Sequence, residues 1–98
     1  MQFLPTINNY MSDRYSNDNY GAHSLCVDMG NIILYYSYKT IVAFSFQGRT
    51  MVRKNDWGPT TGKHLNKIDG GSKEARENRV KGEEFEEKLA QSLKTLGY

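Results

Sequence analysis

The sequence predicts an α+β fold: a four-stranded antiparallel β-meander, a short helix after Trp57, and a C-terminal amphipathic helix packed on the sheet. Residues 24–54 predict the sheet, because they are rich in β-branched and aromatic side chains and are divided by pairs of turn residues. Connections this short allow only antiparallel pairing, since a parallel crossover needs about a dozen residues. With 98 residues, the chain has room for one domain and one modest core.

Residues 1–22 precede the predicted sheet, and we expect them to form an irregular arm rich in Tyr and Asn. The segment shows neither helical nor strand periodicity. Tyr10, Tyr15 and Tyr20 recur every five residues, a spacing that suits neither a helix face nor a strand face. Two interpretations stay open: the Tyr side chains anchor the arm on the sheet as part of a binding surface, or the arm is a disordered terminus.

The strand signals in residues 24–54 indicate four strands, at Ser24–Asp28, Asn31–Ser37, Thr40–Gln47 and Thr50–Lys54. The pair Gly48-Arg49 separates the last two. A Gly in the first position of a two-residue loop favours a type II′ turn, so this pair predicts a tight hairpin.

Both faces of the two central strands are largely apolar. Alternating residues place Ile32, Leu34 and Tyr36 opposite Ile33 and Tyr35 in the second strand, and Val42, Phe44 and Phe46 opposite Ile41, Ala43 and Ser45 in the third. A sheet of this kind needs cover on both faces. We expect the helices to cover one face and the arm or a second subunit to cover the other, which predicts a homodimer or a partner protein.

The short helix is predicted over residues 59–69, because a Gly-Pro pair begins it and a Gly-Gly pair follows it. Its apolar residues Leu65 and Ile68 are expected to face the core. Lys63 and His64 are expected to point outward, where they would serve function rather than folding.

The C-terminal helical segment is predicted over residues 72–96. Phe85, Leu89, Leu93 and Leu96 recur at spacings of four, four and three, which is one apolar stripe of a helix. Within this segment, Gly82 is followed by Glu83, Glu84, Glu86 and Glu87, acids that suit the positive end of a helix dipole. This stripe predicts the contact with the sheet.

Composition and charge exclude several classes of protein. The net charge is only +2, although nine Lys or Arg against four acids lie between Arg49 and Lys81. No apolar run approaches the roughly 18 residues of a membrane span, and the N-terminus lacks the pattern of a signal peptide. Cys26 is the one cysteine, so an internal disulfide is excluded. We therefore expect no membrane association and a reducing cytoplasm.

The string GPTTGKH, from Gly58 to His64, invites comparison with a phosphate-binding loop. It has three residues between its glycines where that motif has four, and His64 stands where Ser or Thr would bind Mg²⁺. A weaker hypothesis stays open, in which a phosphate or carboxylate is held by helix-start amides and one ammonium group, from Thr60, Thr61, Gly62 and Lys63. Helix capping is the alternative explanation of each Thr.

Metal binding and catalysis have little support. His23 and Cys26 form a His-x-x-Cys pattern that Asp28 or His64 would have to complete, far short of a four-ligand zinc motif. Cys26 paired with His64 lacks an acid placed by any motif to orient the imidazole. We predict no enzymatic activity, no metal and no cofactor.

Nucleic acid is the alternative ligand. Basic residues cluster in sequence around the single Trp57, namely Arg49, Arg53, Lys54, Lys63 and Lys67. Cations beside an aromatic stacking platform are the usual means of gripping single strands. The competing interpretation is that Trp57 pins the short helix to the sheet.

The block YYSYKTIVAF followed by MVRKNDWGPTTGKHLNKID, within Asn31–Asp69, resembles a family of small uncharacterised proteins encoded by tailed bacteriophages and by bacterial genomes that carry them. The distinctive residues are Trp57, Thr60, Thr61, Gly62, Lys63, His64 and Leu65. This chain has Lys39 where the resemblance leads us to expect an acid. The family has no known activity that the resemblance could assign to this chain. What the resemblance implies is a phage accessory protein that acts in the bacterial cytoplasm on host machinery or defence.

Together these observations predict a non-enzymatic binding module that acts on a host protein, with counter-defence as its candidate role. The alternative is nucleic-acid or nucleotide binding through the basic segment around Trp57. The residues predicted to bind the partner or an anion are Arg53, Lys54, Trp57, Thr60, Thr61, Lys63 and His64.

Overall fold

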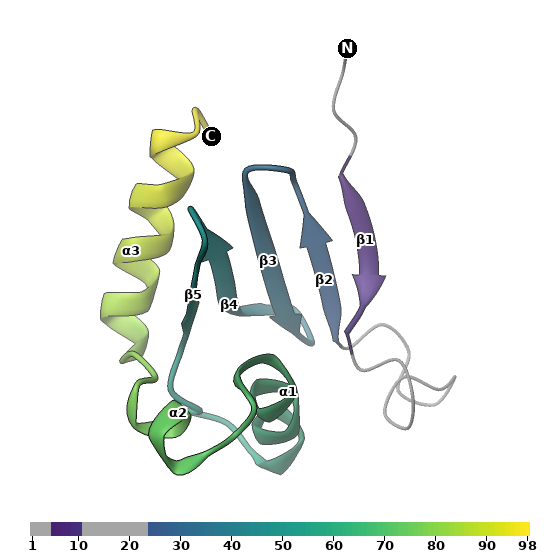
Figure 1. Ribbon diagram of the computed structural model, residues 1–98, viewed down its shortest axis with the longest axis vertical. Coiled ribbons are helices and arrows are strands. Elements are labelled where there is room, and N and C mark those ends of the chain that lie inside the picture. Colours follow the sequence, from purple (N-terminus) through teal and green to yellow (C-terminus); the bar gives the residue numbers. More distant parts are fainter. Residues whose placement is uncertain (1–4, 11–23) are drawn as a thin grey trace.

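The computed structural model describes residues 5–10 and 24–98 and shows an antiparallel sheet with three helices (Figure 1). The elements in chain order are β1 (Thr6–Asn9), β2 (Leu25–Asp28), β3 (Ile32–Ser37), β4 (Thr40–Phe46), β5 (Arg49–Val52), α1 (Pro59–Asp69), α2 (Lys73–Glu77) and α3 (Gly82–Thr95). The strands lie in sequence order, β1-β2-β3-β4-β5. The predicted α+β class, the antiparallel meander and the C-terminal helix are confirmed. In the described part of the chain, no helix has the length and apolarity of a membrane span.

The sheet has five strands, so the prediction of four was wrong. The additional strand, β1, lies in the segment predicted to be an irregular arm, and it pairs with β2 in the register Ile7↔Val27. The Tyr10 N–H donates to the Ser24 carbonyl at 3.0 Å and continues this ladder past the end of the strand. A segment of only four residues shows too little alternation to be predicted as a strand. β1 forms because the edge of β2 offers unpaired backbone groups with which it can pair. Tyr15 and Tyr20 lie outside the described residues.

The β4–β5 turn also differs from the prediction by one residue. Its two loop residues are Gln47 and Gly48, with φ of 53° and 78°, rather than Gly48 and Arg49. Two consecutive positive φ values are the pattern of a type I′ turn. The shift leaves Arg49 inside β5, opposite Phe46.

A β-bulge in β4 changes which residues share a face. Tyr35 lies opposite Ala43, whereas Tyr36 lies opposite Ile41, so Val42 is the extra residue. The predicted strict alternation, with Val42 on the face of Phe44, was therefore wrong. Val42 and Ala43 both lie in the α1-side core and both are 0% exposed.

Each face of the sheet has its own core. On one face, α3 packs Phe85 and Leu89 against β3 and β4, with the Phe44 and Phe85 rings 5.4 Å apart in an edge-to-face contact. On the other face, Leu65 of α1 packs with Val42, Ala43 and Val52. Helices of the same chain therefore cover parts of both faces, and the second face does not depend on the arm or a second subunit alone.

The segment between α2 and α3 returns to the sheet. Ser72 caps α2 by accepting a hydrogen bond from the Ala75 N–H at 3.1 Å. After α2, the backbone of Val80 pairs in parallel with the chain just beyond β5: the Val80 N–H donates to Val52 at 2.8 Å, and the Lys54 N–H donates to Val80 at 2.7 Å. This pairing directs the chain into α3 beside β5 (Figure 1).

Candidate functional site

The loop between β5 and α1 is held by the side chain of Asn55. Its Oδ1 accepts a hydrogen bond from the Trp57 N–H at 2.9 Å, and its Nδ2 donates to the Gly58 carbonyl at 3.2 Å. Asn is well suited to such a turn, because its short amide reaches backbone groups two or three residues on. Trp57 therefore stands on a loop with its own internal bonds.

Arg53 supports Trp57 from the protein side. Its guanidinium carbon lies 4.9 Å from the centroid of the Trp57 ring and 5.8 Å from that of Phe85. Ion pairs hold the same guanidinium to Glu86 at 3.1 Å and to Asp56 at 3.7 Å. The Arg53 side chain is only 13% exposed, and its Nε is buried without a hydrogen-bond partner among the described residues. Arg53 thus serves as a stacking support, a role to which planar guanidinium is suited.

Trp57 itself is 45% exposed, so it is not the core pin that was the competing interpretation. Beside it, α3 begins with a series of acids. A cavity of about 720 Å³ there is lined by Arg53, Asp56, Lys81, Gly82, Glu83, Glu84 and Glu87. Two cations face four acids in this lining. The fold therefore places more negative charge near Arg53, the support of Trp57, than the neighbours of Trp57 in sequence indicate.

The prediction that His64 points outward was wrong. His64 is 2% exposed, and its Nδ1 lies 2.7 Å from the Oγ of Ser37 on β3. The Thr61 hydroxyl lies 3.0 Å from the same Ser37 oxygen. Thr61 and His64 are three residues apart and share the helix face that turns toward the sheet. The spacing of apolar residues could not identify this buried face, because the side chains of Thr61 and His64 on it are polar and form hydrogen bonds with Ser37.

Aromatic rings surround this polar cluster. The ring of Tyr10 makes edge-to-face contacts with His64 and Tyr35, at centroid distances of 6.0 Å and 5.6 Å. Its hydroxyl donates to the Tyr36 carbonyl at 2.5 Å, and burial, with Cys26 and Tyr35 nearby, raises the pKa of Tyr10. Tyr10 therefore anchors the end of β1 on the sheet, as one of the two interpretations of the arm required.

Tyr38 also lies near His64, with the two ring centroids 6.0 Å apart. It is 45% exposed and has a φ of 58°, a left-handed conformation that bulky residues rarely adopt. The Ser37 hydroxyl and the His64 imidazole are the functional groups of a nucleophile and its general base. Ser37 is only 3% exposed, however, and is therefore closed to solvent. The contacts among Ser37, His64 and Tyr10 instead join β3, α1 and the end of β1.

The remaining predicted residues do not converge on one anion site. Thr61 turns inward to Ser37, whereas Lys63 is exposed on the outer side of α1. Thr60 is half-buried, and Lys54 is exposed while its N–H is bonded to Val80. The N-cap of α1 is Gly58, which has no side chain to cap the helix, so neither Thr has the predicted capping role.

Within residues 5–10 and 24–98, no group of three His, Cys, Asp or Glu is arranged to hold a metal ion. Cys26 is half-buried on β2, and burial, with the nearby Asp28 charge, raises the pKa of its thiol. His23, the other half of the His-x-x-Cys pattern, lies outside the described residues.

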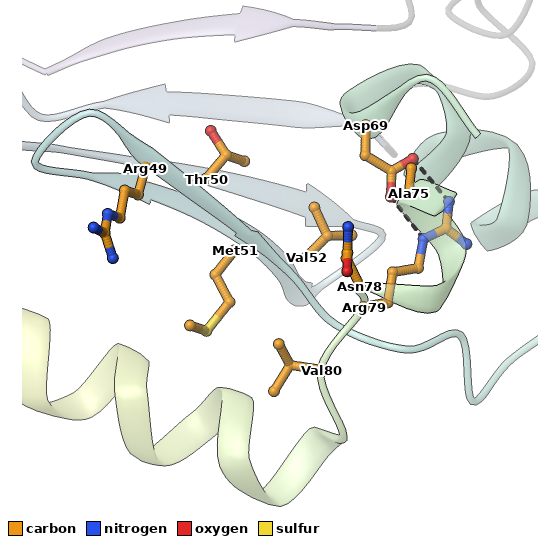
Figure 2. A pocket seen from close by; sticks show the side chains of 9 residues that line it. All are labelled: Arg49, Thr50, Met51, Val52, Asp69, Ala75, Asn78, Arg79 and Val80. Carbon is orange, nitrogen blue, oxygen red and sulfur yellow. Dashed lines mark hydrogen bonds and ion pairs between the residues drawn. The ribbon is translucent and has the colours of Figure 1, made fainter. Parts of the chain in front are cut away.

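A cavity at the edge of β5 was not predicted (Figure 2). Its volume is about 360 Å³, and its lining comprises Arg49, Thr50, Met51, Val52, Asp69, Ala75, Asn78, Arg79 and Val80. These residues come from β5, the end of α1, α2 and the Val80 segment. Nothing in the sequence pattern links the four segments, so only the fold could reveal their meeting.

An ion pair closes one end of this cavity. The Arg79 Nε lies 2.7 Å from Asp69 Oδ2 and its Nη2 lies 2.9 Å from Oδ1, while Nη2 also donates to Asn66 at 3.0 Å. Burial acts to raise the pKa of Asp69, but the hydrogen bonds from Arg79 and from the Gly71 N–H, with the Arg79 charge, outweigh it. The pKa of Asp69 is therefore held below its usual value.

Residues 6–87 match the family of unknown function DUF8033. The chain belongs to the DUF8033 family. The match includes β1 and the first turns of α3, so the family region of this DUF8033 chain is longer than the block at Asn31–Asp69 on which the resemblance was based. No curated protein and no solved structure matches this DUF8033 chain.

Proposed function

We propose that this DUF8033 chain is a non-enzymatic binding module that docks on a protein partner, with Trp57 as the anchor. The observation that carries the proposal is a large aromatic side chain, 45% exposed, on a support of Arg53 and Asn55. Exposed Trp residues are enriched among those that contribute most to protein interfaces. An anchor already fixed in place loses little conformational entropy on binding.

The charge around Trp57 favours a partner with basic groups. Asp56, Glu83, Glu84 and Glu87 line the adjoining cavity, and Glu86 stands 69% exposed beside Arg53. This arrangement repels the phosphates of nucleic acid and attracts Lys or Arg side chains. The exposed positions of Lys54 and Lys63 support the alternative, which is nucleic-acid or nucleotide binding.

The buried chemistry supports a non-enzymatic role. The groups with the potential of a nucleophile and base, Ser37 and His64, are 3% and 2% exposed and contact one another and neighbouring rings. A substrate would have to displace Tyr10 or Tyr38 to reach them.

The biological context rests on the sequence resemblance. We propose a phage or prophage accessory protein that acts in the bacterial cytoplasm on a host protein, with counter-defence as its role. A homodimer is a further part of this proposal, and sedimentation of the purified chain would measure it.

The test compares Trp57→Ala with Tyr98→Ala, because Tyr98 is another exposed aromatic residue, at 64%, and it follows the end of α3. The wild-type chain would be used to capture bacterial proteins, and each captured protein would be purified and titrated by calorimetry with the wild type and with both variants. Trp57→Ala should weaken binding by at least about tenfold, as loss of an interface hot spot does. Tyr98→Ala should bind like the wild type.

Two outcomes would contradict the proposal. The first is a purified partner that binds Trp57→Ala with unchanged affinity. The second is tight binding of oligonucleotides with an affinity that falls steeply with salt, the signature of phosphate contacts. The second outcome would favour the nucleic-acid alternative.

A further inference from the structure

β5 is an edge strand, and among the described residues its outer side has a backbone partner only at its last residue, Val52. Val80 fills the position of a sixth strand beside Val52 and Lys54, through two backbone hydrogen bonds. Beside Arg49 and Thr50, the position of that sixth strand adjoins the cavity shown in Figure 2. The outer edge of β5 therefore offers the position of a sixth strand, and this position is open beside Arg49 and Thr50.

The alternation of backbone directions shows which groups face the opening. The Arg53 N–H donates to Val42 on β4 at 2.9 Å, while the Val52 carbonyl accepts from Val80 on the outer side. Successive residues of a strand point their backbone groups to opposite sides. Thr50 therefore directs its N–H and C=O outward, and Val52 directs its N–H outward. In the part of the chain that the structure describes, none of these three groups has a backbone partner.

The two flanks of the opening differ in polarity. Met51 and Val80 flank the side toward α3, and both belong to the apolar cluster around Phe44 and Phe85. Thr50, Asn78 and the Asp69–Arg79 pair flank the other side. An added strand alternates its side chains between these flanks, which fits one apolar and one polar neighbour in turn.

Positive charge lies at the Arg49 end of the opening. A neighbouring cavity of about 410 Å³ shares Arg49 and Met51 with the first, and its remaining lining is Phe44, Phe46, Gln47, Lys88, Gln91 and Ser92. The charged side chains of that lining are both cations. Because Arg79 is already paired with Asp69, the uncompensated charge along β5 is positive, opposite in sign to the surface around Trp57.

We propose that the edge of β5 accepts an extended segment of a partner protein as a short sixth strand. The segment places an apolar side chain against Met51 and Val80 and an acidic side chain near Arg49 and Lys88. Backbone hydrogen bonds to Thr50 and Val52 supply the affinity, and the two flanks supply the specificity. This site is separate from the Trp57 surface and does not depend on it.

The probe is a capped peptide of about six residues with alternating Val and Thr and one Glu, and a matched peptide in which Lys replaces the Glu. Backbone amide exchange of the full chain would be followed by NMR during titration. The Glu peptide should slow exchange at the Thr50 and Val52 amides by at least about tenfold, because strand pairing shields those N–H groups. The Lys peptide should bind more weakly. Absence of protection at both amides at millimolar peptide would overturn the proposal.

Two substitutions at one position separate backbone from side chain. Thr50→Pro removes the outward N–H and leaves the ladder to β4 intact, since Pro is tolerated on the free side of an edge strand. Thr50→Ala keeps the N–H and removes only the side chain, which is bonded to Ser45 at 2.7 Å. Thr50→Pro should lose peptide binding, and Thr50→Ala should keep it.

Charge reversal tests the predicted acid. Arg49→Glu should reverse the preference between the Glu and Lys peptides, and Trp57→Ala should bind the Glu peptide like the wild type. Equal binding by a folded Thr50→Pro variant would overturn the proposal. So would protection of the Thr50 amide that rises with protein concentration without peptide, because the occupant would then be a second copy of the chain.

Discussion

The Oγ of Ser37 and the Nδ1 of His64 lie 2.7 Å apart in the interior, and this contact fixes α1 on β3. Both residues are almost fully buried. A buried polar group that loses its partner costs about 1–3 kcal/mol, because its desolvation is no longer offset. Any placement of α1 that separates Ser37 from His64 therefore costs free energy, and the pair favours the one observed position of the helix on β3.

Ser37→Ala should lower the free energy of unfolding by about 1–3 kcal/mol, since it leaves the His64 nitrogen and the Thr61 hydroxyl without their shared partner. Lys63→Ala is the matched control on the same helix, and its exposed position should limit the change to about 0.5 kcal/mol. Urea denaturation of the two variants measures both values. Equal stability of Ser37→Ala and wild type would refute the structural role.

Asp69 should make the stability of the protein depend on acidic pH. Its pKa in the folded chain lies below the unfolded value of about 3.9, so the unfolded chain binds the proton more readily. The contribution is fully present above the unfolded pKa, and it is lost as pH falls through the lower folded pKa. Wild-type stability should therefore decline more steeply than that of Asp69→Asn below about pH 4.

At neutral pH the same Asp69→Asn variant should be less stable by about 3 kcal/mol, because the Arg79 side chain, 7% exposed, keeps its charge and loses its counter-ion. Unfolding measured from pH 2 to pH 7 gives both quantities. A constant difference between variant and wild type over this range would contradict the assignment.

Gly82→Ala should disturb Trp57 without touching it. A Cβ at Gly82 would overlap the Arg53 guanidinium, which must then move from its position over the Trp57 ring. Trp57 is the one Trp of the chain, so its fluorescence reports the change directly. Gly58→Ala is the control, because among the described residues, apart from its chain neighbours Trp57 and Pro59, no atom lies within 4 Å of a Cβ at that position. Identical spectra for the two variants would show that Arg53 does not set the position of Trp57.

Local patterns predicted the parts of the fold that depend on neighbours in sequence. The apolar stripe ending at Leu96 predicted α3, and alternation predicted β3, because both signals repeat within one element. β1 was missed because its four residues carry no strand pattern of their own, and its pairing with β2 joins segments that are far apart in the sequence. The β4–β5 turn was predicted one residue too late, because its first residue, Gln47, adopts a left-handed conformation that is usually recognised in a sequence by a Gly.

The candidate site was less predictable than the fold. Trp57 was predicted to belong to the site, which stays a prediction, and most of the acids near it come from α3, far along the chain. His64 was predicted to point outward because it lies one turn inside the start of the helix, where Leu65 and Ile68 were expected to face the core. Its partner, Ser37, becomes adjacent only once α1 packs over the bulge of β4.

The hydrogen bond from the Lys54 N–H to Val80 means that the chain leaves the sheet and rejoins it at one point. α1 and α2 therefore form a closed excursion whose two ends are tied together, so the rest of the sheet and α3 need not move when the excursion opens. Such a segment can detach as one cooperative unit, with little extra entropy cost from its length. Its opening would bare Val42 and Ala43 while Phe44 and Phe85 stayed packed, giving the chain a partly open state with an apolar sheet face and an intact second core.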